Sequence, residues 1–564
     1  MAVYAGSFAD NHALPALTDY ISGRTLTYLD VARRIARLHL FFELAGIKRG
    51  DKIALLGKNT PNWVITFMGT ITYGAVIVPV LPDFNPSDAE NIIDHSDAVA
   101  LFVADDIYSH LNFEAMPKLR VVVSLVSRTV LAEREVPREE GKRRPVSHRS
   151  IVVNLTRRLK ERYPEGFAPS DITYRSIPGG SVAVINYTSG TTGFSKGVML
   201  TIDNLRGNVV FGIRSKLHYQ GSRALSFLPL SHAYGCAFDM LVPLAVGSHI
   251  TLLGKTPTPQ ILLKALKQVR PSLIACVPLI LEKIYRKVVV PLITRKPIRW
   301  VLAVPMLDKA IYSMIRTKLV DAFGGSFEEV IVGGAALNYE VEEFLHKIHF
   351  PLTVGYGMTE CGPLISYSPW RRFALGSSGR TLNHIMEAKI VPDSSLGLSP
   401  EGTPQGEIVV RGLNVMAGYY KNPEATEAVL EPDGWLHTGD MGWLGAPNSR
   451  TVYIRGRYKT MILTANGQNI YPEEIEAKLN NMPYVNECIV IEREGRLIAL
   501  CFPEADELER DGIDTPEKLA ELMEANRRNL NALVAPYEQV QSIEIVNEEF
   551  QKTPKRSIRR FLYK

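Results

Sequence analysis

The chain has 564 residues, of which 46% are hydrophobic and 22% charged, and its 64 Lys and Arg residues against 59 Asp and Glu leave a net charge of +5. These values are close to globular averages, so they exclude extended disorder, collagen-like repeats and a coiled coil. A surplus this small is too dilute to build a phosphate-tracking groove, so composition gives no support for nucleic acid binding. The length predicts three or four structural units, at about 100–200 residues per domain.

The cysteines are odd in number, far apart in the sequence and never in a CxxC spacing (Cys236, Cys276, Cys361, Cys488 and Cys501). This pattern predicts free thiols in a reducing compartment rather than a disulfide framework or a structural zinc site. The N-terminus lacks a basic start followed by an apolar segment, so we expect no signal peptide and a cytoplasmic protein.

Short β-branched runs alternate with helix-length segments from residue 52 onward, which is typical of parallel sheets covered by helices. The uncharged stretch 62–82 contains Thr, Gly and Pro residues. It therefore predicts a buried helix that runs into a buried strand rather than a membrane span. Residues 133–148 are dense in charge and predict a solvated excursion at the surface.

A second set of apolar strands is expected at 183–186, 224–228, 273–277 and 330–333. The expected fold is α/β, with a large N-terminal domain at 1–456 and a small α+β C-terminal domain at 457–564. Within the N-terminal domain we expect two α/β lobes (about 1–175 and 176–391) and then a β-rich subdomain (about 392–456), where the sequence turns to Gly- and Pro-rich short strands.

The most informative segment, residues 187–198, reads YTSGTTGFSKGV and lies between an apolar strand and a helix. Gly190 and Gly193 free the backbone to turn its N–H groups inward, and several hydroxyls and the cation of Lys196 lie close by, all of which suits a polyphosphate. The alternative is an ordinary Ser/Thr/Gly loop. The lysine does not have the spacing of a Walker loop, so P-loop NTPase chemistry is disfavoured.

This segment resembles the phosphate-binding signature of the adenylate-forming (ANL) superfamily, which includes acyl-CoA synthetases, luciferases and nonribosomal adenylation domains. Segments that resemble its other motifs follow in the family's order at 229–235, 355–360, 434–440 and 456–459, so the resemblance covers nearly the whole chain. It implies that the C-terminal domain rotates between two half-reactions about a hinge at Lys459.

The resemblance also implies which residues bind ATP and Mg²⁺. Thr191 and Glu360 are expected to hold the metal, a pairing that a hard cation would select, and Lys196 is expected to act in catalysis. Tyr356 is expected to lie against adenine, and Asp440 to accept the ribose hydroxyls beside Arg457. The full set of expected nucleotide-binding residues is Thr188, Ser189, Gly190, Thr191, Thr192, Gly193, Gly333, Gly334, Ala335, Ala336, Tyr356, Gly357, Met358, Thr359, Asp440 and Arg457.

Two further segments concern the acyl substrate and the thiol. His232 resembles a family histidine near the acyl carboxylate, with an ordinary structural histidine as the alternative. Tyr234 stands where amino-acid-activating relatives carry an aspartate, which argues against an α-amino acid substrate. The apolar run 235–243 fits a hydrocarbon tunnel or a core helix equally well. Gly467, in the hairpin 465–469, is expected to allow the close approach of coenzyme A.

The C-terminal tail departs from the family pattern, which ends with a lysine in a Gly-Lys-Ile-x-Arg context. Anchoring on Ile558 and Arg560 places Ser557 at the lysine position, and only a shifted register offers Lys555 as the catalytic lysine. The tail still offers other cations (Lys552, Lys555, Arg556, Arg559, Arg560 and Lys564), and a solvated basic end is the alternative.

Over its whole length the sequence resembles those of the long-chain acyl-CoA synthetases. The resemblance therefore implies ATP-dependent activation of a medium- to long-chain fatty acid to acyl-AMP and transfer to coenzyme A. The alternatives are delivery to a carrier-protein thiol and a nucleotide-binding protein that has lost catalysis. Basic residues interleaved with apolar ones at 286–300 favour a charged helix flank, with a peripheral membrane contact as the alternative. The sequence does not predict the oligomeric state.

Overall fold

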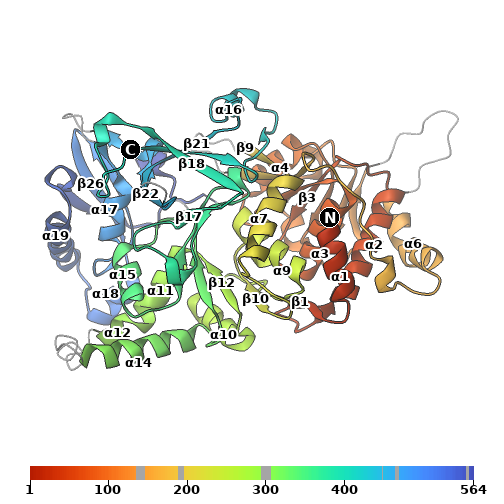
Figure 1. The fold of residues 1–564 in the computed structure, drawn as a ribbon, viewed down its shortest axis with the longest axis horizontal. Helices are drawn as coiled ribbons and strands as arrows, with labels where there is room; N and C mark the ends of the chain where they lie inside the picture. The colour runs from red at the N-terminus through yellow and green to blue at the C-terminus, as the bar shows by residue number, and fades with distance from the viewer. Residues whose placement is uncertain are drawn as a thin grey trace.

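The computed structural model of the protein describes residues 1–134, 147–188, 196–293, 307–446, 449–463, 469–553 and 558–563. Helices and strands alternate along the chain, and the expected α/β class is confirmed. The molecule is elongated, with the N-terminal helices in one half and the C-terminal unit at the opposite end (Figure 1).

An eight-stranded sheet dominates the half that contains the N-terminus. Its central strands pair in parallel, and both faces of the Val-rich strands are buried, which explains their continuous apolar runs. The strand at each edge is antiparallel to its neighbour. In spatial order the sheet contains β20 (Gly418–Tyr419), β9 (Lys196–Thr201), β8 (Val182–Thr188), β4 (Val76–Val80), β3 (Lys52–Leu56), β5 (Ala98–Val103), β6 (Val121–Ser124) and β7 (Val130–Glu133).

The uncharged stretch near residue 62 forms α3 (Pro61–Tyr73), which runs into strand β4. Thr60 caps the helix by accepting a hydrogen bond from the Trp63 N–H, and Gly74 ends it at φ = +91°. The prediction of a buried helix followed by a buried strand is therefore confirmed. Among the helices of the described residues, none combines the length and the apolar character that crossing a bilayer requires.

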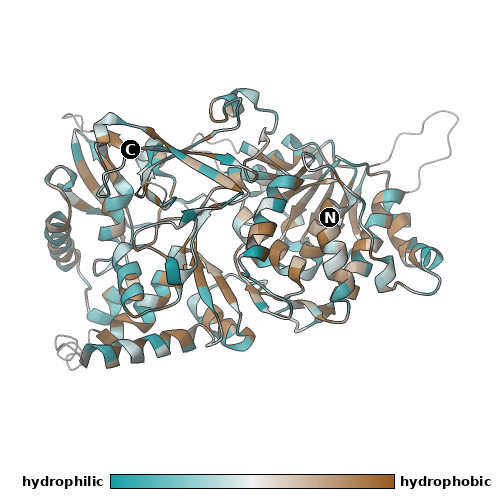
Figure 2. Cartoon of the chain, viewed as in Figure 1, coloured by the Kyte–Doolittle hydropathy of each residue, from teal (hydrophilic) through white to brown (hydrophobic). Residues whose placement is uncertain are grey.

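The remaining longer helices pack around the sheets, and the outer ones, such as α6 and α19, carry polar faces (Figure 2). They are α1 (Ala2–Asp10), α2 (Tyr28–Leu44), α4 (Pro86–His95), α6 (His148–Arg162), α7 (Ile202–Arg214), α10 (Pro259–Val269), α11 (Pro278–Val288), α14 (Leu307–Ala322), α15 (Tyr339–Lys347), α17 (Pro472–Leu479), α18 (Ala505–Asp511) and α19 (Pro516–Leu533).

Two smaller sheets come next in space. Strands β12 (Leu273–Cys276), β13 (Glu329–Val332) and β14 (Leu352–Val354) are parallel, so their carboxyl ends lie side by side. A four-stranded sheet contains β10 (Arg223–Ser226), β11 (His249–Leu252), β1 (Pro15–Asp19) and β2 (Thr25–Thr27). Strands from both sides of residue 175 thus share sheets, and the expected boundary between two lobes stays a prediction.

The later part of the chain is richer in antiparallel strands. One sheet contains β18 (Met386–Pro392), β19 (Gln405–Gly412), β21 (Leu436–Leu444) and β22 (Val452–Arg457), and a short one contains β15 (Tyr356–Gly357), β16 (Leu364–Tyr367) and β17 (Arg380–Thr381). The C-terminal unit packs α17 and α19 on β25 (Val485–Arg493), β26 (Arg496–Pro503) and β27 (Ser542–Ile545), with β23 (Ile462–Leu463) and β24 (Asn469–Ile470) before them. The domain limits at 456 and 457 stay predictions.

His218, which follows α7, is a buried histidine with 3% relative exposure. Its Nε2 is hydrogen-bonded to the Phe238 carbonyl at 3.1 Å, whereas its Nδ1 is buried without a partner among the described residues. Burial lowers the pKa of His218 to about 4. The folded protein therefore keeps this imidazole neutral at a pH where the unfolded chain protonates it.

We predict a loss of stability on mild acidification that depends on His218. Between pH 7.5 and 5 the unfolded chain binds a proton that the folded chain does not, so the free energy of unfolding falls by about 2 kcal/mol through this residue. Urea denaturation of His218→Gln should show a correspondingly smaller fall over this pH interval, whereas a control replacement of the exposed His110 should not. An unchanged pH dependence in His218→Gln would contradict the prediction.

Candidate active site

Glycines stand at the carboxyl ends of the parallel strands β13 and β14, the edge where α/β sheets commonly bind ligands. Gly333 and Gly334 follow β13, and Gly334 has φ = +92°. Ala335 and Ala336 come next and are exposed. Gly355 follows β14, and its N–H donates to the Val332 carbonyl at 2.8 Å. The residues expected to line adenine are therefore adjacent in space.

Gly357 must be a glycine for steric reasons, because a Cβ there would lie 2.3 Å from the Pro363 carbonyl oxygen. The Pro363 carbonyl also accepts a hydrogen bond from the N–H of Met358 at 2.9 Å. This tight turn leads into the one-turn 3₁₀ helix Thr359–Cys361, which carries Glu360. The turn therefore brings Glu360 back toward the strand ends.

Tyr356, Asp440 and Arg457 form a connected group at this edge. The Tyr356 hydroxyl donates to Asp440 Oδ2 at 2.6 Å, and Arg457 Nε donates to Asp440 Oδ1 at 3.2 Å. Asp440 and Arg457 are also paired residues of β21 and β22. Burial raises the pKa of Asp440, and the opposing effects of Arg457 and Tyr356 only partly compensate it. The Arg457 side chain is 67% exposed, so the guanidinium faces solvent on one side.

Glu360 and Lys196 both contact Tyr419, Glu360 at the hydroxyl and Lys196 at the ring. The Tyr419 hydroxyl donates to Glu360 Oε1 at 3.0 Å, and Lys196 Nζ lies 4.8 Å from the centroid of the Tyr419 ring. Burial and the neighbouring Glu360 raise the pKa of Tyr419 far above its ordinary value, so the hydroxyl remains a donor. The acid and the cation that were expected to share a triphosphate are thus held near one another.

The two groups belong to one constellation. Glu360 follows Tyr356 by four residues through the tight turn at Gly357, and its charge contributes to the raised pKa values of both Asp440 and Arg457. Among the described residues there is no cluster of three or more His, Cys, Asp or Glu side chains that could hold a metal by itself. One carboxylate is compatible with Mg²⁺, which usually binds one or two carboxylates together with substrate phosphates and water.

Helix α7 holds the chain segments on both sides of the site through hydrogen bonds of its side chains. The Asn204 amide donates to the carbonyls of Leu413 and Val415 at 2.8 Å each, and the Asn208 side chain accepts from the Leu364 N–H at 3.0 Å. A Cβ at Gly207 would lie 2.0 Å from Asn414 Oδ1, so the close approach of the helix requires glycine there. The Met416 N–H then donates to the Glu360 carbonyl at 2.8 Å.

Several predicted site residues lie outside the described residues: Ser189, Gly190, Thr191, Thr192, Gly193, Gly467 and Lys555. Residues 189–195 lie outside the described residues, between β8 and β9 in the chain, and the flanking residues Thr188 and Lys196 are described. They are opposite one another in the ladder, and the Thr188 hydroxyl donates to the Lys196 carbonyl at 3.4 Å. The roles assigned to all these residues stay predictions.

His232 and Tyr234 stand at the start of a short helical region. His232 is half-buried, and its backbone carbonyl accepts from the Cys236 N–H at 2.8 Å. The Tyr234 hydroxyl donates to the Ile331 carbonyl at 3.0 Å, and its ring lies beside Gly333. Residues Cys236–Leu241 form a π-helix, an irregularity that often marks functional sites. The apolar run is therefore buried helix, and its use as a tunnel wall stays a prediction.

The C-terminal tail is tied to its own unit at two cations. Lys552 Nζ forms ion pairs with Glu487, at 2.6 Å, and with Glu549. Arg560 forms an ion pair with the buried Glu476. Both cations are thus engaged by carboxylates, and the residue that replaces the family's catalytic lysine stays a prediction.

Tyr419 is the site residue that sequence reasoning missed. It follows Gly418 in a β-rich segment, and nothing in its local pattern marks it as functional. Its position results from the pairing of Tyr419 with Val198, far away in the chain. A signal was nevertheless present in its polar hydroxyl on a buried ring, which requires a hydrogen-bond partner.

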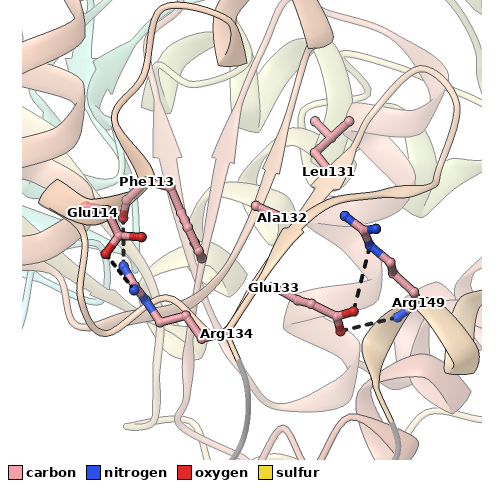
Figure 3. A pocket seen from close by; sticks show the side chains of 7 residues that line it. All are labelled: Phe113, Glu114, Leu131, Ala132, Glu133, Arg134 and Arg149. Atoms are coloured by element: carbon pink, nitrogen blue, oxygen red, sulfur yellow. Dashed lines mark hydrogen bonds and ion pairs between the residues drawn. The ribbon is translucent and has the colours of Figure 1, made fainter.

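A surface cavity of about 620 Å³ lies elsewhere, against β7 at the opposite edge of the large sheet from β20. Two ion pairs face it, Glu114 with Arg134 and Glu133 with Arg149 (Figure 3). The cavity is lined by Phe113, Glu114, Leu131, Ala132, Glu133, Arg134 and Arg149. It is therefore no part of the candidate active site.

Solved structures share this fold over the whole chain. An anthranilate CoA ligase in complex with anthranoyl-AMP superimposes with a TM-score of 0.74 at 18% identity and covers 100% of this chain and 96% of its own. A benzoate CoA ligase from Burkholderia xenovorans gives a TM-score of 0.73 at 18% identity and covers 99% of each chain. The fold is that of the adenylate-forming acid–thiol ligases.

The sequence comparison gives the family. The profile described as AMP-binding enzyme matches residues 5–420, and the chain belongs to this family within the ANL superfamily. Long chain acyl-CoA synthetase 6 of Arabidopsis thaliana is 31% identical over 79% of this chain and 63% of its own length. The long-chain fatty acid–acyl-carrier-protein ligase AEE15 of the same plant is 27% identical over 87% of this chain and 74% of its own length.

We predict that Tyr419→Phe lowers acyl-AMP formation. The variant keeps the ring beside Lys196 but removes the hydrogen bond to the Glu360 carboxylate. A hydrogen bond to a charged group contributes about 1.5–3 kcal/mol, so kcat should fall about tenfold or more. Pyrophosphate release at saturating ATP measures the effect, and Tyr73→Phe, which removes a hydroxyl in α3, is the matched control. Equal rates in Tyr419→Phe and the control would contradict the prediction.

Proposed function

We propose that the protein activates a medium- to long-chain fatty acid with ATP to form acyl-AMP and then transfers the acyl group to coenzyme A. The observation that carries this proposal is that Lys196 and Glu360 both contact Tyr419. The hydrogen-bonded group of Tyr356, Asp440 and Arg457 lies next to them. The sequence relatives include long-chain acyl-CoA synthetases, which supports the substrate class.

In this proposal the residues of the site act by position and charge. Lys196 binds the phosphates, and Glu360 is the carboxylate that would hold Mg²⁺, which when bound neutralises phosphate charge. Asp440 accepts hydrogen bonds from the ribose hydroxyls, and Arg457 keeps the Asp440 carboxylate oriented. The fatty acid carboxylate is already ionised at neutral pH, so it attacks the α-phosphate without a protein base, and pyrophosphate leaves. The thiol of the acceptor then displaces AMP.

A carrier-protein thiol is the second candidate acceptor. The observation that favours it is the similarity to the acyl-carrier-protein ligase AEE15, which is 27% identical over 87% of this chain. Both candidates share the first half-reaction. They differ only in which thiol receives the acyl group, so the two half-reactions must be measured separately.

The proposal is tested with ATP, Mg²⁺ and fatty acids of different chain lengths. Pyrophosphate release with palmitate and with shorter acids shows whether adenylation occurs and which length is preferred. Addition of coenzyme A, or of a carrier protein with its phosphopantetheine thiol, identifies the acceptor. A protein that binds ATP but releases no pyrophosphate with any acid would refute the proposed activity and favour a nucleotide-binding protein without catalysis.

We predict large losses of adenylation in Lys196→Ala and Glu360→Ala. Each variant removes one charge directed at the triphosphate, and loss of one preorganised electrostatic group typically costs about 10²–10³ in rate. Acyl-AMP formation measures the effect. The matched controls Lys255→Ala and Glu424→Ala remove the same charges from exposed positions. Wild-type pyrophosphate release in either site variant would reject its assignment.

The tail is tested by replacing its cations one at a time. Lys552 is held between Glu487 and Glu549, so Lys552→Ala is expected to affect stability more than adenylation. If Lys555 provides the catalytic cation, Lys555→Ala should lower acyl-AMP formation about 10²-fold or more while Arg556→Ala retains most of it. The reverse ranking would assign the role to Arg556, and full activity in both variants would exclude either residue.

A further inference from the structure

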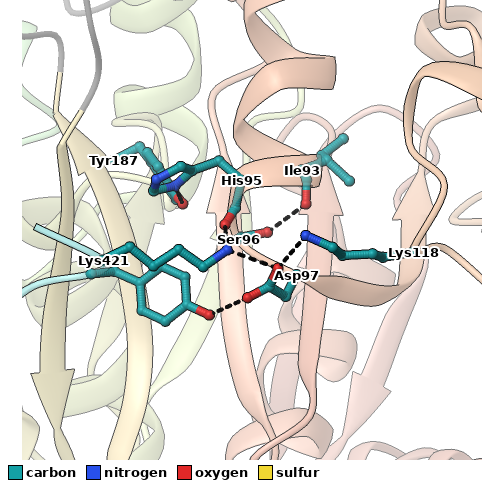
Figure 4. Close-up of polar contacts among 8 residues, drawn as sticks. Ile93, His95, Ser96, Asp97, Lys118, Tyr187 and Lys421 are labelled. Carbon is teal, nitrogen blue, oxygen red and sulfur yellow. Dashed lines mark hydrogen bonds and ion pairs between the residues drawn. The ribbon is translucent and has the colours of Figure 1, made fainter.

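Asp97 lies at the turn between α4 and β5. Its backbone has φ = +60°, a left-handed conformation that Asp and Asn tolerate better than most residues. Oδ1 accepts from Lys118 Nζ at 2.6 Å and from Lys421 Nζ at 2.8 Å, and Oδ2 accepts from the Tyr420 hydroxyl at 2.6 Å (Figure 4). Asp97 thus joins the α4–β5 turn to the chain that follows β20.

This carboxylate stays ionised in the folded protein. Burial acts to raise the pKa of Asp97, but the hydrogen bonds from Lys118, Lys421 and Tyr420 outweigh it and hold the pKa well below its usual value. The effect is mutual for Lys118, because Asp97 raises the pKa of the Lys118 ammonium group. The contacts are charge-assisted, which makes them shorter and stronger than neutral hydrogen bonds.

His95, two residues earlier, ties the same turn to strand β8. Its Nδ1 is hydrogen-bonded to the Tyr187 hydroxyl at 2.7 Å, and its carbonyl accepts from Lys421 Nζ at 2.9 Å. The imidazole ring packs edge-on against both Tyr187 and Tyr420, with centroids 5.8 and 6.0 Å away. Tyr187 precedes Thr188, where the expected phosphate loop begins.

Strand β9, which begins with Lys196, lies between these two anchored strands. Tyr187 is opposite Gly197, and the Tyr420 N–H donates to the Gly197 carbonyl at 2.7 Å. A Cβ at Gly197 would lie 3.1 Å from the Tyr187 ring and 3.3 Å from Tyr420 Cβ. The two tyrosines therefore enclose the backbone directly after Lys196.

Strand β20 has only two residues, so its backbone pairing with β9 gives it little stability of its own. Successive side chains of an extended segment face opposite sides. Tyr420 accordingly turns toward Asp97, while Tyr419 turns toward Glu360 and Lys196. A shift of this segment would move the Tyr419 hydroxyl away from Glu360.

We propose that Asp97 is a positioning residue for adenylation, which anchors Tyr420 and Lys421 so that Tyr419 holds Glu360 and Lys196 in place. Asp97 itself touches no substrate in this arrangement. The inference rests on the proposed function and adds a residue remote from the expected motifs, 99 positions before Lys196. Misplacement of reacting groups by about 1 Å can cost about 100-fold in rate.

The test measures pyrophosphate release with palmitate, ATP and Mg²⁺ in Asp97→Ala, Asp97→Asn and Tyr420→Phe. We expect Asp97→Ala to lower kcat about tenfold or more, with a smaller change in KM for palmitate, because the fatty acid site is not involved. The Mg²⁺ concentration for half-maximal rate should rise, since Glu360 is displaced. Asp97→Asn, which keeps the turn and one acceptor for Tyr420, should lie between Asp97→Ala and the wild type.

Two controls separate positioning from general destabilisation. Lys118→Ala removes one partner of Asp97 without touching the segment after β20, so it should leave kcat and the Mg²⁺ dependence unchanged. The loss in the Asp97→Ala, Tyr419→Phe double variant should be smaller than the product of the two single losses, because both changes act on the contact between Tyr419 and Glu360. Tyr420→Phe, which loses only the hydrogen bond to Asp97, should reproduce part of the effect.

Wild-type kcat and Mg²⁺ dependence in both Asp97→Ala and Tyr420→Phe would overturn the inference, as would additive losses in the Asp97→Ala, Tyr419→Phe double variant. Loss of activity in Lys118→Ala equal to that in Asp97→Ala would also overturn it, because the effect would then come from the ion pair rather than from the anchored segment. Absence of pyrophosphate release by the wild type with every acid would refute the proposed function, and this inference with it.

Discussion

The site depends on one aromatic residue between two opposite charges. Lys196 lies near the face of the Tyr419 ring, and the hydroxyl of the same ring holds Glu360. No direct ion pair joins Lys196 to Glu360 in the described part of the chain. In a direct ion pair, Lys196 and Glu360 would have neutralised one another. The tyrosine instead keeps them close but separate, so both remain available to a ligand that carries negative charge and a bound cation.

A second constraint is the buried carboxylate of Asp440. Removing a charge from water costs several kcal/mol unless hydrogen bonds replace the lost solvation, and Asp440 accepts one from Tyr356 and one from Arg457. The exposed side of Arg457 shows that this carboxylate lies just below the surface rather than in the deep core. Because a hydrogen bond holds each of its oxygens, such a carboxylate can accept further hydrogen bonds from hydroxyl groups without rearranging.

Much of the fold and part of the site could be predicted from the sequence because the relevant signals are local. The buried helix before β4, the strand expected at 330–333 and the glycines around Tyr356 all follow from patterns of a few residues. Tyr419 and Asp97 were not predicted, since their importance comes from contacts between distant segments. The hydrogen bond between Asp97 and Tyr420 spans 323 positions. Neither hydrophobic periodicity nor turn chemistry encodes a contact of that kind.

The attachment of the C-terminal unit bears on the proposed rotation about Lys459. This unit has its own apolar core, formed by residues such as Ile475, Leu479 and Leu530. Several of its contacts with the rest of the chain are polar: Arg286 donates to the Val485 carbonyl at 3.2 Å, the Asn338 amide to the Ala477 carbonyl at 2.5 Å, and Arg455 pairs with Glu474 at 3.2 Å. Water can replace such hydrogen bonds when the surfaces separate, whereas a continuous apolar core could not be divided without exposing it. These polar contacts are therefore compatible with the rotation about Lys459 that the family resemblance implies, which stays a prediction.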